Sequence, residues 1–138
     1  MKHLLAAAAL ILASSPAAAT IIESGAGDWS DIPMMRTQVG AGLDGDAVGA
    51  IDELLARREC TIPGQRRGNV DMRVPFIVLF NASGAVDRLV VQRLECPRAE
   101  GVLAGEVLRM IERGAFAPEG GRREGWFRGE VSFSFSQV

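Results

Sequence analysis

The sequence predicts an α+β domain of two layers: a three-stranded antiparallel sheet with a helix packed on one face, and an additional N-terminal helix. Two observations predict it. In residues 70–80 and again in 126–137, apolar residues recur at alternate positions, which is the period of a strand with one buried face. In residues 97–113 the apolar period lengthens to that of a helix. The sheet is therefore expected to combine a hairpin with a C-terminal strand.

The hairpin is expected to have its turn at Asn81-Ala82-Ser83-Gly84, because Asn and Gly tolerate the positive φ that a tight reversal needs. Its first strand, residues 70–80, has apolar side chains at alternate positions, and its second, residues 85–94, is rich in β-branched residues. Ile77 and Leu79 make the other face of the first strand apolar as well. The pattern leaves open which face of the hairpin is buried.

The helix and the last strand have clear limits. Pro97 suits a first helical turn and Gly114 a left-handed stop, so the helix is expected over residues 97–113. In residues 126–137 hydrophobic side chains alternate with polar ones, the clearest single-face strand of the chain. The predicted core draws on both strands of the hairpin, the helix and the last strand: Phe76, Val78, Phe80, Leu89, Val91, Leu103, Val107, Ile111, Phe127, Val131, Phe133 and Phe135.

An N-terminal arm and a helix are expected to occupy residues 20–69. Asp44 or Asp46 can cap a helix that runs to about Glu59, since a carboxylate accepts hydrogen bonds from the free N–H groups of the first turn. The same acidic residues suggest a calcium loop, but Val48 occupies the next ligand position, which favours the cap. In the arm, Trp29 is expected to pack against the sheet.

The first 19 residues are typical of a signal peptide. Lys2 precedes an apolar run, residues 4–13, that is too short to span a bilayer, and the small residues Ala17 to Ala19 suit a cleavage site. The alternative is a short anchor or a buried helix. The signal peptide predicts export to the periplasm and no stable membrane anchor after cleavage.

Cleavage would remove Lys2 and His3, which are the only lysine and histidine of the 138 residues. The remaining 14 arginines and 17 acidic residues give a net charge of −3, so general attraction to nucleic acid is not expected. Without His or Lys, the chain lacks a Ser-His pair, a Schiff-base lysine and a His-ligated metal. Asp87 and Glu95 could do acid–base work, but solvent-facing carboxylates are the commoner case. We expect no enzyme activity, cofactor or metal.

Cys60 and Cys96 are an even pair of cysteines in a chain predicted to be exported, which favours a disulfide between them. A redox-active or metal-binding pair is the alternative. No CxxC motif is present and no histidine could complete a zinc site, so both cysteines are expected to be structural.

The second half of the chain resembles the C-terminal domain of TonB-type energy transducers. The resemblance follows the order of the segments rather than any one motif. It lies in the strand Gly68 to Phe80, the turn Asn81-Ala82-Ser83-Gly84-Ala85-Val86, the helix end Ile111-Glu112-Arg113-Gly114-Ala115-Phe116-Ala117-Pro118, the Gly120-Gly121 loop and the strand Val131-Ser132-Phe133-Ser134-Phe135. The aromatic-Pro signature that usually precedes the first strand is not evident. The resemblance implies a TonB C-terminal-like domain over residues 70–138.

In that family, the strand that matches residues 126–136 adds a short extended segment of an outer-membrane receptor. The resemblance therefore implies binding of protein or peptide segments by strand addition, as an exposed sheet edge allows. The alternatives are that this strand is central or covered by the N-terminal arm, or that the protein is a disulfide-stabilised structural or homodimerising module. The candidate peptide-binding residues are Trp126, Arg128, Glu130, Ser132, Ser134 and Ser136.

Overall fold

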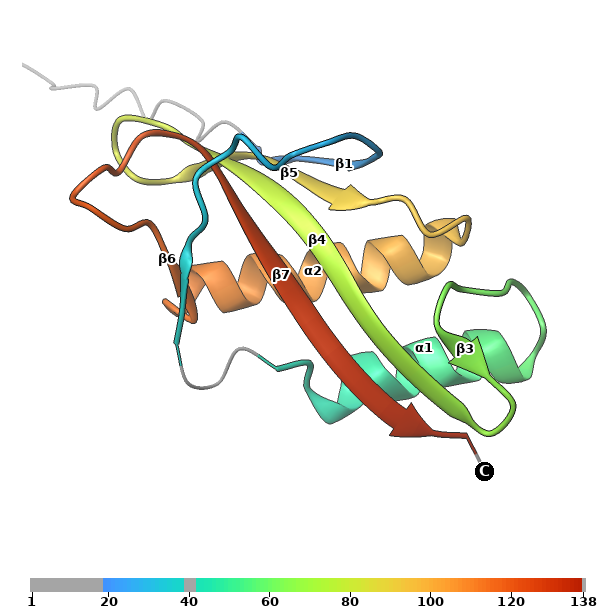
Figure 1. Ribbon diagram of the computed structural model, residues 1–138. Coiled ribbons are helices and arrows are strands. Elements are labelled where there is room, and N and C mark those ends of the chain that lie inside the picture. The colour runs from blue at the N-terminus through green and yellow to red at the C-terminus, as the bar shows by residue number, and fades with distance from the viewer. Residues whose placement is uncertain (1–18, 39–41, 138) are drawn as a thin grey trace, which may run out of the picture.

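The computed structural model describes residues 19–38 and 42–137, which form two layers (Figure 1). One layer is a mixed sheet of five strands, and the other contains the helices α1 (Gly45–Ala56) and α2 (Pro97–Glu112), which lie behind the two longest strands in Figure 1. Buried apolar side chains from both helices and from the sheet form one cluster. The predicted α+β class is confirmed.

The sheet is built around its two longest strands, β4 (Asn69–Phe80) and β7 (Gly125–Ser136). They pair antiparallel over their whole length, from Asn69 opposite Ser136 to Phe80 opposite Gly125. Strand β5 (Val86–Gln92) pairs antiparallel with the other side of β4 and closes the predicted hairpin. The even-numbered residues of β4 face the helices, which settles the orientation of the hairpin.

The expectation of a three-stranded antiparallel sheet is corrected by two further strands. Strand β1 (Ile21–Gly25) pairs with β5 in parallel, so the sheet is mixed, and β3 (Gln65–Arg66) pairs with the start of β4. The first four residues of β1 are exposed, and β3 has two residues. Both strands are held by backbone pairing, so neither shows the alternation of buried side chains by which a strand is recognised in a sequence.

Both helices begin as their sequences predict, but α1 ends at Ala56, three residues before the expected end at Glu59. The Oδ1 of Asp44 accepts a hydrogen bond from the Ala47 N–H at 2.8 Å and caps α1, so this carboxylate acts as a cap. Pro97 is the first residue of α2, and Gly114 follows the helix with a φ of +80°. Every predicted core residue is buried except Phe135, which is partly buried because it lies near the end of β7.

Strands β2 (Arg36–Thr37) and β6 (Phe116–Ala117) form a separate two-stranded antiparallel sheet. The predicted signal peptide lies outside the described residues, apart from Ala19. Within residues 19–38 and 42–137, no helix is long and apolar enough to cross a membrane.

Candidate binding edge of strand β7

The N-terminal arm, residues 20–38, joins the two edges of the sheet. Its first part is β1, which lies beyond β5, and its later part lies beside β7, where Met34 forms a parallel bridge with Arg128. Figure 1 shows this blue segment crossing the ends of β4 and β7 on the face opposite the helices. The arm is anchored by Met35, which is 2% exposed and belongs to the core, and by the half-buried Trp29. Trp29 thus packs as the sequence suggested.

Arg128 is the residue of β7 to which the arm is bonded. Its backbone N–H donates to the Pro33 oxygen at 2.8 Å, and its own carbonyl oxygen accepts from the Met35 N–H at 2.8 Å. Its guanidinium Nε donates to the Ile32 oxygen at 2.7 Å. One residue therefore fixes three positions of the arm, at Ile32, Pro33 and Met35, along the edge of β7.

Along the rest of β7, the backbone groups of every second residue point in the same direction as those of Arg128. Backbone groups alternate in direction along a strand, so the N–H and C=O groups of Glu130, Ser132, Ser134 and Ser136 point away from β4, as those of Arg128 do. Pro75, which has no N–H, lies opposite Glu130 and agrees with this direction. Among the described residues, only the arm at Arg128 pairs with the outer edge of β7.

The six residues predicted from sequence all lie on the face of β7 opposite the helices. Trp126 is half-buried opposite Leu79, and Arg128 is half-buried and bonded to the arm. The other four, residues 130, 132, 134 and 136, are exposed. The structure thus separates the six into two groups. Sequence reasoning missed the arm residues Ile32 and Pro33 at this edge, because neither belongs to a periodic pattern.

A small hollow of about 240 Å³ lies where the arm leaves the sheet, next to Glu130. Trp29 and Met34 of the arm and Pro75 of β4 line it together with Asp28. Hydrogen bonds from Ser30, and to a smaller degree the charge of Arg128, lower the pKa of the Asp28 carboxyl below its ordinary value of 3.8. This end of the free edge therefore has an ionised carboxylate and an apolar wall side by side.

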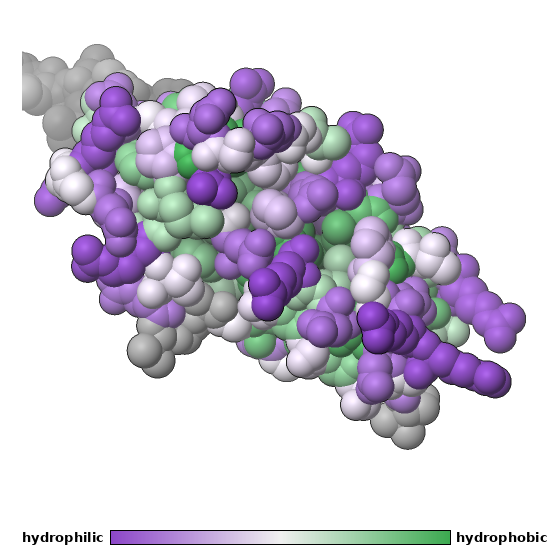
Figure 2. All heavy atoms as spheres, viewed as in Figure 1, coloured by the Kyte–Doolittle hydropathy of each residue, from purple (hydrophilic) through white to green (hydrophobic). Residues whose placement is uncertain are grey.

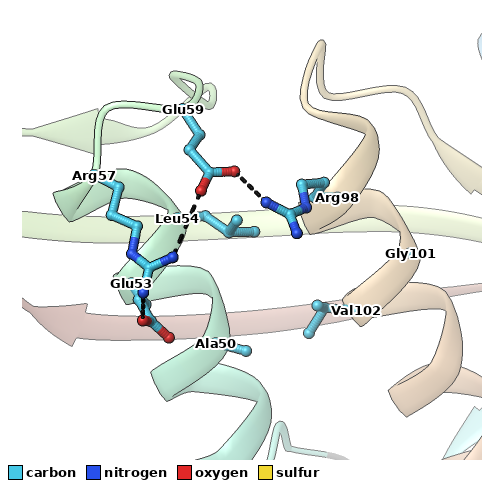
Figure 3. Close-up of a pocket in the computed structure, with 8 residues that line it drawn as sticks. All are labelled: Ala50, Glu53, Leu54, Arg57, Glu59, Arg98, Gly101 and Val102. Carbon is cyan, nitrogen blue, oxygen red and sulfur yellow. Dashed lines mark hydrogen bonds and ion pairs between the residues drawn. The ribbon is translucent and has the colours of Figure 1, made fainter.

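A second concave surface, a groove of about 490 Å³, lies between α1 and α2 (Figure 3). Ala50 and Val102 point toward one another across it in the close-up. At its rim Glu59 forms an ion pair with Arg98 at 2.6 Å, and Arg57 pairs with both Glu53 and Glu59. The charges at the rim neutralise one another, so the groove has no unpaired ion to orient a polar ligand.

The predicted disulfide between Cys60 and Cys96 is present. Cys96 is buried and precedes α2, while Cys60 lies four residues after the last residue of α1. The disulfide and the Glu59–Arg98 ion pair join the same two segments, one by a covalent bond and the other by a pair of charges. Both connections hold the end of α1 to the start of α2.

Across residues 19–38 and 42–137, no three His, Cys, Asp or Glu side chains gather closely enough to hold a metal ion. Of the two concave surfaces and the strand edge, the edge is the one with unpaired backbone groups. Comparison with protein-family models, with curated proteins and with solved structures finds no match.

Proposed function

We propose that this protein binds extended protein or peptide segments by strand addition to the outer edge of β7 between Glu130 and Ser136. The observation that carries the proposal is the row of backbone N–H and C=O groups there, which point away from β4 and have no strand beside them among the described residues. Such a row is a template for another extended chain, because alternate residues of the added chain can pair with these N–H and C=O groups. The proposed role is binding and not catalysis.

The arm supports the proposal by its own pairing. At Arg128 it already lies along β7 as an extended segment in parallel orientation, with hydrogen bonds of 2.8 Å in both directions. The arm then turns away toward β6, where Arg36 lies opposite Ala117. A ligand strand would continue the same edge beyond the point where the arm leaves it.

The side chains along the free edge favour an added strand. Ser132, Ser134 and Ser136 are small and uncharged, so they do not repel a neighbouring chain, and no proline interrupts them. By resemblance to TonB C-terminal domains, the ligand class we propose is an extended segment of an outer-membrane receptor. The encounter would take place in the periplasm after export.

An amide NMR titration with extended N-terminal peptides from outer-membrane receptors tests the proposal. We expect shifts concentrated at residues 130–136, with the amides of Ser132 and Ser134 newly protected from exchange, because those N–H groups would gain partners. Binding that leaves residues 130–136 unshifted, or no binding by any of the peptides, would contradict it.

Two substitutions at Ser134 sharpen the test. Ser134→Pro removes an outward N–H and should abolish binding, yet it leaves the bonds to β4 intact because the Ser134 backbone groups point away from that strand. Ser134→Ala removes the hydroxyl, keeps the N–H and should bind normally. If the folded Ser134→Pro protein binds like the Ala variant, strand addition at this edge is wrong.

A second candidate is a homodimer in which β7 pairs with β7 of another copy. An antiparallel pair centred on Ser132 would place Glu130 opposite Ser134 of the second copy, so no like charges face each other. Sedimentation over a range of concentrations separates the candidates. A dimer that Ser134→Pro dissociates would favour this role, whereas a monomer at all concentrations would exclude it.

A further inference from the structure

A cavity of about 510 Å³ lies at the opposite end of β7 from the free edge. It is bounded by the hairpin turn, where Ser83 and Gly84 lie, and by the loop that joins β6 to β7. Phe80 and Pro118 supply apolar wall, and Arg122 and Arg123 supply the charge. The volume falls within the range of cavities that hold small molecules. In Figure 2, hydrophilic residues gather along the left margin, where Figure 1 draws this loop.

Arg122 and Arg123 are among the arginines of the described residues whose side chains have no partner. Neither guanidinium has an ion pair or a side-chain hydrogen bond with any described residue. No carboxylate lines the cavity. Glu119 of the same loop is paired with Arg36 at 3.4 Å, and Glu124 lies outside the lining. The arginines that are paired with a carboxylate are Arg36, Arg57, Arg88, Arg98, Arg109 and Arg113.

The loop that bears the two arginines is a turn whose N–H groups are not joined to the helices or to the sheet of the described residues. Gly120 and Gly121 have φ values of +74° and +73°, and among the described residues no backbone hydrogen bond joins the loop N–H groups of residues 120–123 to another part of the chain. Outward N–H groups of a loop bind anions, because their partial charges add to those of nearby cations. The guanidinium group has a planar fork of donors that fits the oxygens of a carboxylate or a phosphate.

We propose that this cavity binds a small amphipathic anion, with a carboxylate or phosphate head on Arg122 and Arg123 and an apolar body against Phe80 and Pro118. The positive charge of the cavity favours an anionic head group. The chain is acidic overall, and yet no acidic side chain lines this surface. The arm, bonded to Arg128, lies between the cavity and the free edge. The site is therefore independent of strand addition, and either proposal can fail alone.

Titration of isotope-labelled protein in phosphate-free buffer, followed by amide NMR, tests the site. The probes are octanoate and octyl phosphate. Acetate is the control that has the anionic group without the alkyl chain, and octylammonium is the control that has the same alkyl chain with a positive charge. We expect saturable shifts at Ser83, Gly84 and Gly121 with one or both amphipathic anions and none with octylammonium. The anion that binds with the lower Kd shows whether the site prefers a carboxylate or a phosphate. Equal binding of acetate and octanoate, or saturation by octylammonium, would overturn the proposal.

Arginine variants give the matched control. Arg122→Gln and Arg123→Gln should each raise the Kd at least about tenfold, because each removes hydrogen bonds to a charged group. The double variant Arg66→Gln/Arg67→Gln removes two charges, one more than either single variant, from another hollow of about 390 Å³, and should still leave the Kd within about twofold. If the two arginine pairs affect binding equally, the interaction is a general charge effect and the site is wrong.

Discussion

The guanidinium Nε of Arg128 donates a hydrogen bond of 2.7 Å to the carbonyl oxygen of Ile32, 96 positions earlier in the chain. This bond ties the N-terminal arm to the strand that forms the candidate binding edge. The backbone N–H of Arg128 adds a bond to the next carbonyl, that of Pro33. Arg128 therefore sets where the covered part of β7 ends and its free part begins.

Arg128→Met is expected to lower the free energy of unfolding by about 1–2 kcal/mol, because it keeps the aliphatic stem and removes a half-buried hydrogen bond from a charged donor. Urea unfolding measures the loss, and hydrogen exchange at the Met35 amide should become faster. Arg73→Met is the control, because Arg73 lies on the same face of the sheet and is exposed. It should change stability by less than about 0.5 kcal/mol. Equal losses in the two variants would show that the bond to Ile32 contributes nothing.

Removing the disulfide should lower the free energy of unfolding far more than removing the ion pair beside it. The bond between Cys60 and Cys96 spans 36 positions, so Cys60→Ala/Cys96→Ala is expected to lower the free energy of unfolding by about 3–4 kcal/mol, mainly by releasing the unfolded chain. Glu59→Gln, which breaks the pair with the exposed Arg98, should cost less than about 1 kcal/mol. Denaturant unfolding of both variants makes the comparison. A similar loss of free energy of unfolding in the two variants would contradict the view that the disulfide stabilises by constraining the unfolded chain.

Gly129 is required by the ring of Phe76 on the neighbouring strand. A Cβ at position 129 would lie 2.5 Å from Phe76 Cζ, and Phe76 is fully buried, so Gly129→Ala should destabilise by about 1–3 kcal/mol through displacement of the ring. Gly105→Ala in α2 meets no atom within 4 Å and should stabilise by about 0.5–1 kcal/mol through helix propensity. Thermal unfolding of the two variants is the measurement, and opposite signs are expected.

The Asp28 carboxyl should titrate below its ordinary pKa of 3.8 because Ser30 bonds to its charged form. A lowered pKa means that the stabilising contribution of Asp28 is complete above the ordinary value and is lost as pH falls through the folded value. Ser30→Ala removes the hydroxyl donor and should raise the pKa toward 3.8, as carbon-detected NMR of the carboxyl group would show. Ser24→Ala, on β1, is the control and should leave the titration unchanged.

The periodic elements were predictable, and so was the face on which the candidate residues lie. The helix over Pro97–Glu112 and the strand over Gly125–Ser136 bury one side each, and that burial imposes the spacing of apolar residues that the sequence displays. The same spacing puts Ser132, Ser134 and Ser136 on the side away from the core. The disulfide was also predictable, because two cysteines in a chain with the features of a signal peptide favour one bond.

The extent of the sheet and the state of its edges were not predictable. Strand β1, with its exposed Ile21 and Ile22, and the arm at Pro33 are joined to the sheet by backbone hydrogen bonds. Every residue except proline offers the same backbone donor and acceptor, so such pairing leaves no pattern in the sequence. The order of residues alone therefore specifies which side chains are buried, because burial imposes a spacing of apolar residues. Which strand edges are covered and which are free is settled only in the folded chain, because that depends on long-range backbone hydrogen bonds.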